Sequence, residues 1–498
     1  MNKNYIGIDL GASSGRVSVG SFDGKKIAVN EICRFENRPV FLHNTFYWDF
    51  LRLFSEVKIG ISKSMMSYEN QIHKMGIDTW GIDFGLIDSQ GSLLSNPVSY
   101  RDKRTQGMLE EVSKIVSLED IFLNSGEFIM EINTLFQIYS LIKSNSSLLK
   151  EADKLLMIPD LFNYFLTGEK FGEFSDVATT SLFDQSQKKW SNYLIKKLSI
   201  PSNIFPEIIY PGMSVGKTTP LINEELNIRG IEVIATGSHD ASSAIAGFPV
   251  SRELSSKKFA GIIIGTWSGL GVELKDKPII NKEVFNLGFS NECGVLGRFS
   301  FQKIISGLWL MQECRDYWNK KEGREISWQE IDNGAFKAPA FKCFIDVDDP
   351  VFTNKSSNIV ENIAAYFKKT NQKVELAREV ISRTAYEGLV FKYKKAILDI
   401  ESVLGYKIEA AFLTGGGSNN KILCQWISDA LGVMVISGVS ETTTVGNILM
   451  QMKADKEIAD MDEGRGIVAS SYPLIYYTPK GDADWDKGYE NYLKILKP

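Results

Sequence analysis

Residues 234–247 (Ile-Ala-Thr-Gly-Ser-His-Asp-Ala-Ser-Ser-Ala-Ile-Ala-Gly) predict a buried strand, a tight turn and a helix near the middle of the chain. Small residues recur at helical spacing after Asp240, up to Pro249. An aspartate at a helix start fits two roles, a cap or a catalytic base. His239, which precedes this aspartate, is one of three histidines in the chain. The small side chains that follow Asp240 let a ligand or another part of the protein come close. A cap needs no such clearance, so the stretch favours a base, with the cap as the open alternative.

The totals describe an ordinary soluble protein of two or three domains. The chain has 498 residues, of which 44% are hydrophobic and 23% are charged. Its net charge of −5 gives no general attraction to nucleic acid or to an anionic membrane. We find no apolar run of about 18 residues, the length that a membrane span needs. Without a visible signal peptide or paired cysteines, we expect a cytoplasmic protein with reduced thiols, no structural zinc, and a monomeric or homodimeric state.

A second candidate site is the glycine-rich turn between two predicted strands in residues 5–20. Its backbone N–H groups, two hydroxyls and Arg16 form a concavity that suits phosphate oxygens. Asp9 lies where the first strand meets the turn, a position suited to hydrated Mg²⁺. The run lacks the Gly-Lys-Ser/Thr of a Walker P-loop, and a plain hairpin is the open alternative.

Residues 75–88 predict a buried strand, an irregular stretch around Gly81 and a further strand. Asp78, Trp80 and Asp83 are costly in such apolar surroundings unless their polar atoms are paired. A polar pocket for a hydroxylated ligand would explain them; turn aspartates beside a core tryptophan are the alternative.

Residues 261–273 repeat the design of strand, Gly/hydroxyl turn and strand about 256 residues after the first copy. This repeat indicates two similar halves, each with one phosphate-binding hairpin, unless the likeness of the two hairpins is coincidence. Later, a strand at 408–414 runs into Gly415-Gly416-Gly417, and a helix follows. Glycines at such a strand end let a flat ligand such as adenine lie on the backbone, although a lone glycine triplet is weak evidence.

The remaining pattern gives coarser expectations. We expect a strand at 26–36, helices at 46–67, 299–320 and 380–404, a mainly helical region at 108–195, an irregular one at 196–230, and a helix starting at 440–442 with close packing at Gly446.

Taken together, these stretches resemble the FGGY carbohydrate kinases over nearly the whole chain, and among them most closely the kinases of L-rhamnulose. The resemblance rests on the order and number of the motifs, which are Asp9–Arg16, Gly76–Phe84, Tyr100–Asp102, Asn133–Gln137, Ser238–Asp240, Gly265–Ser268, Asn291-Glu292, Gly307–Leu310 and Gly415–Ser418. It implies an α/β fold of two actin-like, RNase H-like domains, with ATP and sugar in the cleft between them. We expect domains at 1–246 and 247–455, and a tail at 456–498 that packs back on the body.

The resemblance also implies roles for single residues. ATP would contact Ala12, Ser13, Ser14, Gly15, Arg16, Thr266, Gly415, Gly416 and Gly417. Sugar would contact Gly81, Asp83, His239, Ala241 and Asn291. Asp240 would be the catalytic base, and Asp9 and Asp240 would hold Mg²⁺ through water.

The implied reaction is ATP-dependent phosphorylation of the 1-hydroxyl of a 6-deoxyketose, L-rhamnulose by the resemblance. Ala241 stands where the kinases of L-rhamnulose carry Thr, and the loss of that hydroxyl puts the sugar in doubt rather than the reaction. A kinase of L-fuculose or of another ketose or polyol is therefore the main alternative. A non-catalytic sugar or nucleotide sensor would have no need of Asp240, and a chaperone-like ATPase would need a substrate-binding domain for which only about 50 residues remain after the last motif.

Overall fold

The computed structural model describes residues 2–353, 358–373, 376–481 and 483–496. Its contacts divide the chain into two compact units that are discontinuous in sequence. Unit 1 comprises Met1–Ser255, Glu273–Phe301 and Glu441–Ser471, and unit 2 comprises Ser256–Val272, Gln302–Ser440 and Tyr472–Pro498. The expected domain boundaries at 246 and 455 stay a prediction. The tail is shared, because residues up to Ser471 belong to unit 1 and those from Tyr472 belong to unit 2.

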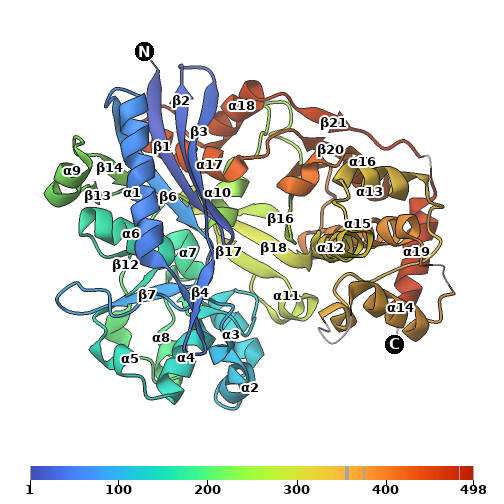
Figure 1. The fold of residues 1–498 in the computed structure, drawn as a ribbon, viewed down its shortest axis with the longest axis horizontal. Coiled ribbons are helices and arrows are strands. Elements are labelled where there is room, and N and C mark those ends of the chain that lie inside the picture. The colour runs from blue at the N-terminus through green and yellow to red at the C-terminus, as the bar shows by residue number, and fades with distance from the viewer. Residues whose placement is uncertain (1, 354–357, 374–375, 482, 497–498) are drawn as a thin grey trace. The chain divides into compact units, whose positions relative to one another are not determined.

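Unit 1 is built on one mixed sheet with the strand order β13-β14-β6-β1-β2-β3 (Figure 1). These strands are β1 (Lys3–Leu10), β2 (Ser14–Phe22), β3 (Ile27–Glu36), β6 (Ile72–Thr79), β13 (Ser214–Lys217) and β14 (Glu232–Ile234). Strands β1, β6 and β14 are parallel, whereas β2 and β3 extend the sheet as antiparallel hairpins. The parallel strands therefore end at the same edge of the sheet, where an open α/β sheet commonly binds its ligand.

The two faces of this sheet are covered by different helices because their side chains alternate in size. Ile6, Ile8 and Val17 lie on the face that packs on α1 (Phe50–Ser67) and α6 (Ile158–Thr167). The opposite face carries glycines, and α17 (Thr442–Ala454) packs there against β1 and β6. A Cβ at Gly20 would lie 2.3 Å from Ile448 of α17. Small residues in these strands thus let a helix lie directly on the sheet.

Helix α10 (Asp240–Ala246) packs closely on α17. A Cβ at Gly446 would lie 1.9 Å from the carbonyl oxygen of Ser243, and one at Gly247 would lie 2.1 Å from that of Thr442. The close packing expected at Gly446 is therefore confirmed. The small residues of α10 therefore make room for another helix of the protein, α17.

Unit 1 also has a second core, around residues such as Phe136, Phe174 and Phe183. The remaining elements of unit 1 are β4 (Pro39–Leu42), β5 (Thr45–Trp48), β7 (Phe84–Ile87), η1 (Lys103–Thr105), α2 (Met108–Ser113), α3 (Leu118–Ser125), α4 (Thr134–Lys143), α5 (Ser147–Glu151), β8 (Lys154–Met157), β9 (Phe171–Glu173), α7 (Phe174–Ala178), β10 (Phe183–Asp184), β11 (Lys189–Trp190), α8 (Asn192–Lys197), η2 (Ser202–Ile204), β12 (Glu207–Ile209), α9 (Pro220–Leu226), α11 (Lys282–Leu287), β17 (Ser290–Cys293), η3 (Val295–Gly297) and α18 (Met461–Ser471).

Unit 2 is built on a sheet in which β18, β16, β15, β19, β20 and β21 are neighbours in that order. Its elements are β15 (Phe259–Ile264), β16 (Trp267–Lys275), β18 (Arg298–Ser306), α12 (Trp309–Glu322), α13 (Trp328–Lys337), η4 (Pro350–Thr353), α14 (Ile359–Lys369), α15 (Arg378–Leu404), β19 (Ala410–Thr414), η5 (Gly416–Asn419), α16 (Lys421–Leu431), β20 (Met434–Ser437), β21 (Ile475–Tyr477) and α19 (Trp485–Ile495). The first residues of β18 and the last of β16 belong to unit 1.

The internal repeat is confirmed by the topology of the two sheets. In both, an antiparallel hairpin (β1–β2 or β15–β16) is followed by parallel strands (β6 and β14, or β19 and β20). An antiparallel strand, β13 or β21, closes the same edge of each sheet. The two halves therefore repeat one plan, as expected for two RNase H-like domains.

Three local expectations were wrong. Residues 299–306 belong to strand β18, and only α12, from Trp309, is helical in the region expected to be one helix. Phe46–Trp48 belong to strand β5, and α1 begins after Asp49, whose side chain accepts a hydrogen bond from Arg52 N. Residues 196–230 contain β12, β13 and α9 rather than irregular structure alone. In the first case a strand with its first residues buried on both faces has the same continuous apolar pattern as a buried helix.

Candidate active site

Three carboxyl groups meet at the edge of unit 1 where its parallel strands end. Asp9 and Asp78 are register partners in β1 and β6, so their side chains lie next to each other. Thr79 pairs with His239, which brings the start of α10 and Asp240 to the same edge. Burial raises the pKa of Asp78 well above its usual value, and the charges of Asp9 and Asp240 raise it further. The edge therefore brings carboxyl groups together, and their proximity disfavours the ionised form of Asp78.

Asp240 is the most accessible of the three carboxyl groups. Its side chain keeps 35% of its exposure, whereas Asp9 is 4% exposed and Asp78 is fully buried. The N-cap of α10 is His239, and its side chain makes no capping hydrogen bond, so Asp240 does not serve as the cap residue. Its surroundings raise the pKa of Asp240 to about 6 by desolvation, against the effect of the His239 charge. A carboxylate with this pKa can accept a proton near neutral pH.

His239 connects Asp240 to a second carboxylate. Its Nε2 lies 3.6 Å from Oδ1 of Asp240, and its Nδ1 lies 3.1 Å from Oε2 of Glu292 on β17. Burial alone would lower the pKa of His239, but Glu292 and Asp240 raise it to about 10. Desolvation raises the pKa of the buried Glu127 well above its usual value, and the charge of Glu292 raises it further. His239 is thus held as a cation beside the candidate base.

The hairpin turn at 11–15 is held by backbone bonds, while its tip stays accessible. Gly11 N donates to Ser14 O at 2.9 Å, and Asn37 Nδ2 donates to Gly11 O at 2.8 Å. Ser13 is exposed. Arg16 on β2 donates to Asp9 at 3.0 Å and pairs with Glu441 just before α17. The arginine expected to meet phosphate therefore lies beside the carboxylate expected to meet Mg²⁺.

Of the predicted sugar contacts, Gly81 and Asp83 occupy the loop after β6. A Cβ at Gly81 would lie 2.9 Å from Thr179 Cγ2, which explains the glycine. Asp83 is buried, and its carboxylate accepts hydrogen bonds from Trp48 Nε1 at 2.6 Å and Trp80 Nε1 at 3.1 Å. It also accepts from the backbone N of Tyr100 and from Gln137 Nε2. Asp83 fixes this loop through protein contacts, and its contact with sugar stays a prediction.

Asn291 and Ala241 complete the predicted sugar set. The side chain of Asn291 is buried and pairs with both backbone groups of Ile279, donating to its O and accepting from its N at 2.8 Å each. The residue after it, Glu292, makes the bond to His239. Ala241 follows Asp240, and its backbone N donates to the Asp240 carboxylate. The structure thus brings His239, Asp240 and Ala241 together, and it uses Asn291 to hold a neighbouring loop.

In unit 2 the predicted nucleotide contacts lie on two turns that follow adjacent strands. Thr266 donates from Oγ1 to Gln312 Oε1 at 3.1 Å, and its carbonyl accepts from Gly307 N at 3.0 Å. In the glycine triplet, a Cβ at Gly417 would lie 2.2 Å from Ile264 Cγ2, and Gly415 has a φ of +80°. A Cβ at Gly416 would meet nothing within 4 Å. Gly417 is required by close packing and Gly415 by its positive φ. Gly416 borders open space.

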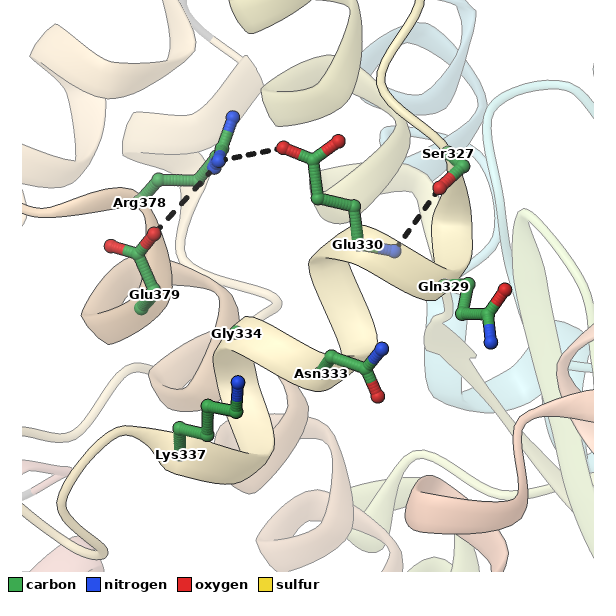
Figure 2. Close-up of a pocket in the computed structure, with 8 residues that line it drawn as sticks. All are labelled: Ser327, Gln329, Glu330, Asn333, Gly334, Lys337, Arg378 and Glu379. Carbon is green, nitrogen blue, oxygen red and sulfur yellow. Dashed lines mark hydrogen bonds and ion pairs between the residues drawn. The ribbon is translucent and has the colours of Figure 1, made fainter.

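A cavity of about 480 Å³ in unit 2 has no link to these residues. It lies between α13 and the start of α15, and Figure 2 shows Arg378 reaching across it to Glu330. Arg378 donates to Glu330 at 2.9 Å and to Glu322 at 2.8 Å, so these charges satisfy one another. None of the predicted site residues lines it.

Sequence reasoning left several residues of this site without a role. The sequence places Asp78 in a possible polar pocket but gives it no role beside Asp9 and Asp240. It marks Glu292 only as part of a motif, although Glu292 bonds to His239 from 53 positions away. Glu127, Asp176 and Asn447 were not singled out at all. Asn447 on α17 donates to Asp78 at 2.6 Å. No local pattern marks these residues, because their partners are distant in sequence.

Comparisons with known proteins cover the whole chain. Sequence profiles of the FGGY family of carbohydrate kinases match at residues 4–247 for the N-terminal domain and 260–454 for the C-terminal domain. A rhamnulokinase of Oceanobacillus iheyensis is 37% identical over 96% of this chain and 98% of its own. A rhamnulokinase of Bacteroides thetaiotaomicron is 33% identical over the full length of both chains.

Solved structures share the fold at low sequence identity. The xylulose kinase of Lactobacillus acidophilus matches with a TM-score of 0.80 at 14% identity, over 99% of this chain and 96% of its own. The glycerol kinase of Plasmodium falciparum with ADP matches with a TM-score of 0.76 at 16% identity, over 99% and 97%. In the part of the chain that the structure describes, no helix is long and apolar enough to cross a membrane.

Proposed function

This chain belongs to the FGGY family of carbohydrate kinases, and we propose that it transfers the γ-phosphoryl group of ATP to the 1-hydroxyl of L-rhamnulose. The observation that carries the chemistry is Asp240, an accessible carboxylate beside a buried histidine cation at the end of the parallel strands. The choice of sugar is supported by the rhamnulokinases that match along the whole chain. Transfer of a phosphoryl group needs positioning and charge stabilisation more than covalent help, which these residues supply.

In the proposed reaction Asp240 acts as the general base. Its carboxylate accepts the proton of the sugar 1-hydroxyl while that oxygen forms a bond to the γ-phosphorus. The bond from the γ-phosphorus to the bridging oxygen breaks, and ADP leaves with the bonding electrons. Asp240 then holds the proton until it passes to solvent. General-base help of this kind is worth roughly 10²–10⁴ in rate.

His239 and Glu292 keep the base ready. The cationic imidazole lies 3.6 Å from Asp240 and favours its ionised form. Glu292, 3.1 Å away on the other side of the ring, fixes the orientation of the imidazole and favours its protonated form. In this account His239 also donates to a sugar hydroxyl from its edge nearest Asp240.

The nucleotide contacts stay as predicted from the sequence. The turn from Ala12 to Gly15 would bind phosphate oxygens through backbone N–H groups, and Arg16 would add positive charge there. Thr266 and the Gly415–Gly417 turn would contact the nucleotide and its adenosine. Among these glycines, Gly416 is the one with open space above its backbone.

The carboxylates at the strand edge fit a hydrated Mg²⁺. Oxygen donors suit this ion, which usually keeps several waters and takes only one or two carboxylates. One oxygen of Asp78 is buried without a hydrogen-bond partner among the described residues, and Asp9 and Asp240 raise its pKa, so a cation would relieve this repulsion. Asp9 and Asp240 would hold the ion through water. When bound, it would neutralise charge on the β- and γ-phosphates.

A coupled assay of ADP release tests which sugar the protein phosphorylates. L-rhamnulose, L-fuculose, D-xylulose, L-ribulose and glycerol would be compared at equal concentration with MgATP. We expect the highest kcat/KM for L-rhamnulose. A higher value for L-fuculose would assign the chain to that sugar, and ATP consumption that no sugar increases would refute the proposed function.

A further inference from the structure

Three carboxyl groups lie buried in unit 1 near the start of α7, and two of them are explained by local hydrogen bonds. Glu173 accepts from the backbone N of Ser175 at 2.9 Å and from that of Ser238 at 3.1 Å. Asp160 accepts from the backbone N of Glu173 at 3.1 Å. These two side chains hold β9, α7 and the loop before α10 together.

Asp176 on α7 has no such explanation. Its side chain is fully buried, and neither carboxyl oxygen has a hydrogen-bond partner among the residues that the structure describes. Burial raises the pKa of Asp176 well above its usual value; the charges of Glu173 and Asp240 raise it further, and His239 opposes them. A buried carboxyl group without a partner destabilises a fold, so its presence calls for a ligand or another compensating role.

The backbone around Asp176 places it between the two loops that carry the predicted sugar contacts. On one side, Ser175 Oγ accepts from His239 N at 3.2 Å. On the other, the backbone O of Asp176 accepts from Thr179 Oγ1, which itself accepts from Ile82 N at 2.9 Å. The charges of His239, Asp240 and Asp83 all act on the Asp176 carboxyl group. Asp176 thus shares its surroundings with the candidate base and with the loop at 81–83.

Neighbouring side chains show the same surplus of acceptors. Glu127 Oε2 and Gln185 Oε1 are buried and lack hydrogen-bond partners within the described part of the chain. Gln185 donates to Asn291 O at 2.5 Å, and Glu127 lies beside Glu292, so both belong to the surroundings of β17. A ligand rich in hydroxyl donors would satisfy such acceptors, whereas a phosphate or a carboxylate would not.

We propose that Asp176 is a specificity-determining residue that accepts hydrogen bonds from hydroxyl groups of the sugar other than the one that reacts. This inference rests on the proposed function, and it adds a contact that distinguishes one ketose from another. Ala241 offers no hydroxyl to the sugar, so a carboxyl group on α7 gives the site a polar contact from another element. The residue remains buried and unpaired in the free protein because its partner is the substrate.

The test compares Asp176→Leu, which keeps the branched shape and replaces both oxygens by methyl groups, with Asp176→Asn, which keeps one acceptor. Asp160→Asn is the matched control, since it changes another buried carboxyl group whose partner is a backbone N–H. For each protein the melting temperature is measured alone, with L-rhamnulose and with MgATP, and KM and kcat are measured by ADP release.

We expect Asp176→Leu to melt no lower than the wild type, because it loses an unpaired buried carboxyl group. Its KM for L-rhamnulose should rise about 10- to 100-fold, the loss typical of a hydrogen bond to a charged or ionisable group. Its stabilisation by sugar should fall while its stabilisation by MgATP persists. Asp176→Asn should lie between this variant and the wild type, and Asp160→Asn should keep the wild-type KM. The preference for L-rhamnulose over L-fuculose should narrow in Asp176→Leu.

An unchanged KM and an unchanged sugar-induced shift in Asp176→Leu would overturn the inference. So would a lower melting temperature of Asp176→Leu with wild-type behaviour of Asp176→Asn, because that pattern indicates a structural role. The wild-type measurements test the proposed function separately: if no sugar of the panel stabilises the wild type or releases ADP, the function itself fails. If another sugar does so, the same variants are measured with that sugar.

Discussion

Turnover should fall as the pH is lowered, along an acid limb set by Asp240. Desolvation raises the pKa of this carboxyl group to about 6, against the opposing charge of His239. A general base acts only in its ionised form, so activity is present above this pKa and lost below it. With a pKa of about 6, about 99% of the group is ionised at pH 8 and about 9% at pH 5. We therefore expect kcat to fall about tenfold over this range.

The assay measures ADP release at saturating sugar and MgATP, with saturation verified at each pH. His239→Gln serves as the informative variant, because removal of the cation that lowers the pKa of Asp240 should move the acid limb to higher pH. A wild-type kcat that stays constant from pH 8 to pH 5, in protein that remains folded, would refute the assignment of the limb to Asp240. An unshifted limb in His239→Gln would refute the coupling between the two residues.

Two further predictions concern the nucleotide turn and the stability of unit 1. Gly417→Ala should lower the melting temperature, because its Cβ would lie 2.2 Å from a side-chain carbon, whereas Gly416→Ala, with open space, should keep it and raise the KM for ATP. Equal melting temperatures would contradict this, as would an unchanged KM in Gly416→Ala. Glu273→Ala should lower the free energy of unfolding in urea by about 3–5 kcal/mol, because it leaves the charge of the buried Arg465 without its carboxylate partner. A loss below about 1 kcal/mol would contradict this pairing.

Much of the fold could be predicted because its signals are local. The two hairpins and the sequence of strand, turn and helix at 232–246 follow from glycine position and hydrophobic period. The repeat between the halves could also be recognised, since each copy places Gly and hydroxyl residues between two strands. Strand β18 could not be distinguished from a helix, because its first residues are buried on both faces and lack alternation.

Only some residues of the candidate site could be identified from the sequence. Asp9, His239 and Asp240 stand next to turns and could be singled out by type and position. Glu292 and Asn447, which contact the site, could not be identified in this way. They lie on β17 and α17, far along the chain from the residues that they contact. The apolar setting of Asp83 indicated a need for pairing, but not that Trp48 and Gln137 supply it.

The role of Asp240 as the base is tested by the turnover of Asp240→Asn with L-rhamnulose and MgATP, measured together with the binding of both ligands. The variant keeps the size of the side chain at the start of α10 and removes its negative charge together with its ability to take a proton. We expect a kcat lower by at least about 10²-fold, with sugar and nucleotide still bound. A kcat equal to that of the wild type would contradict this role.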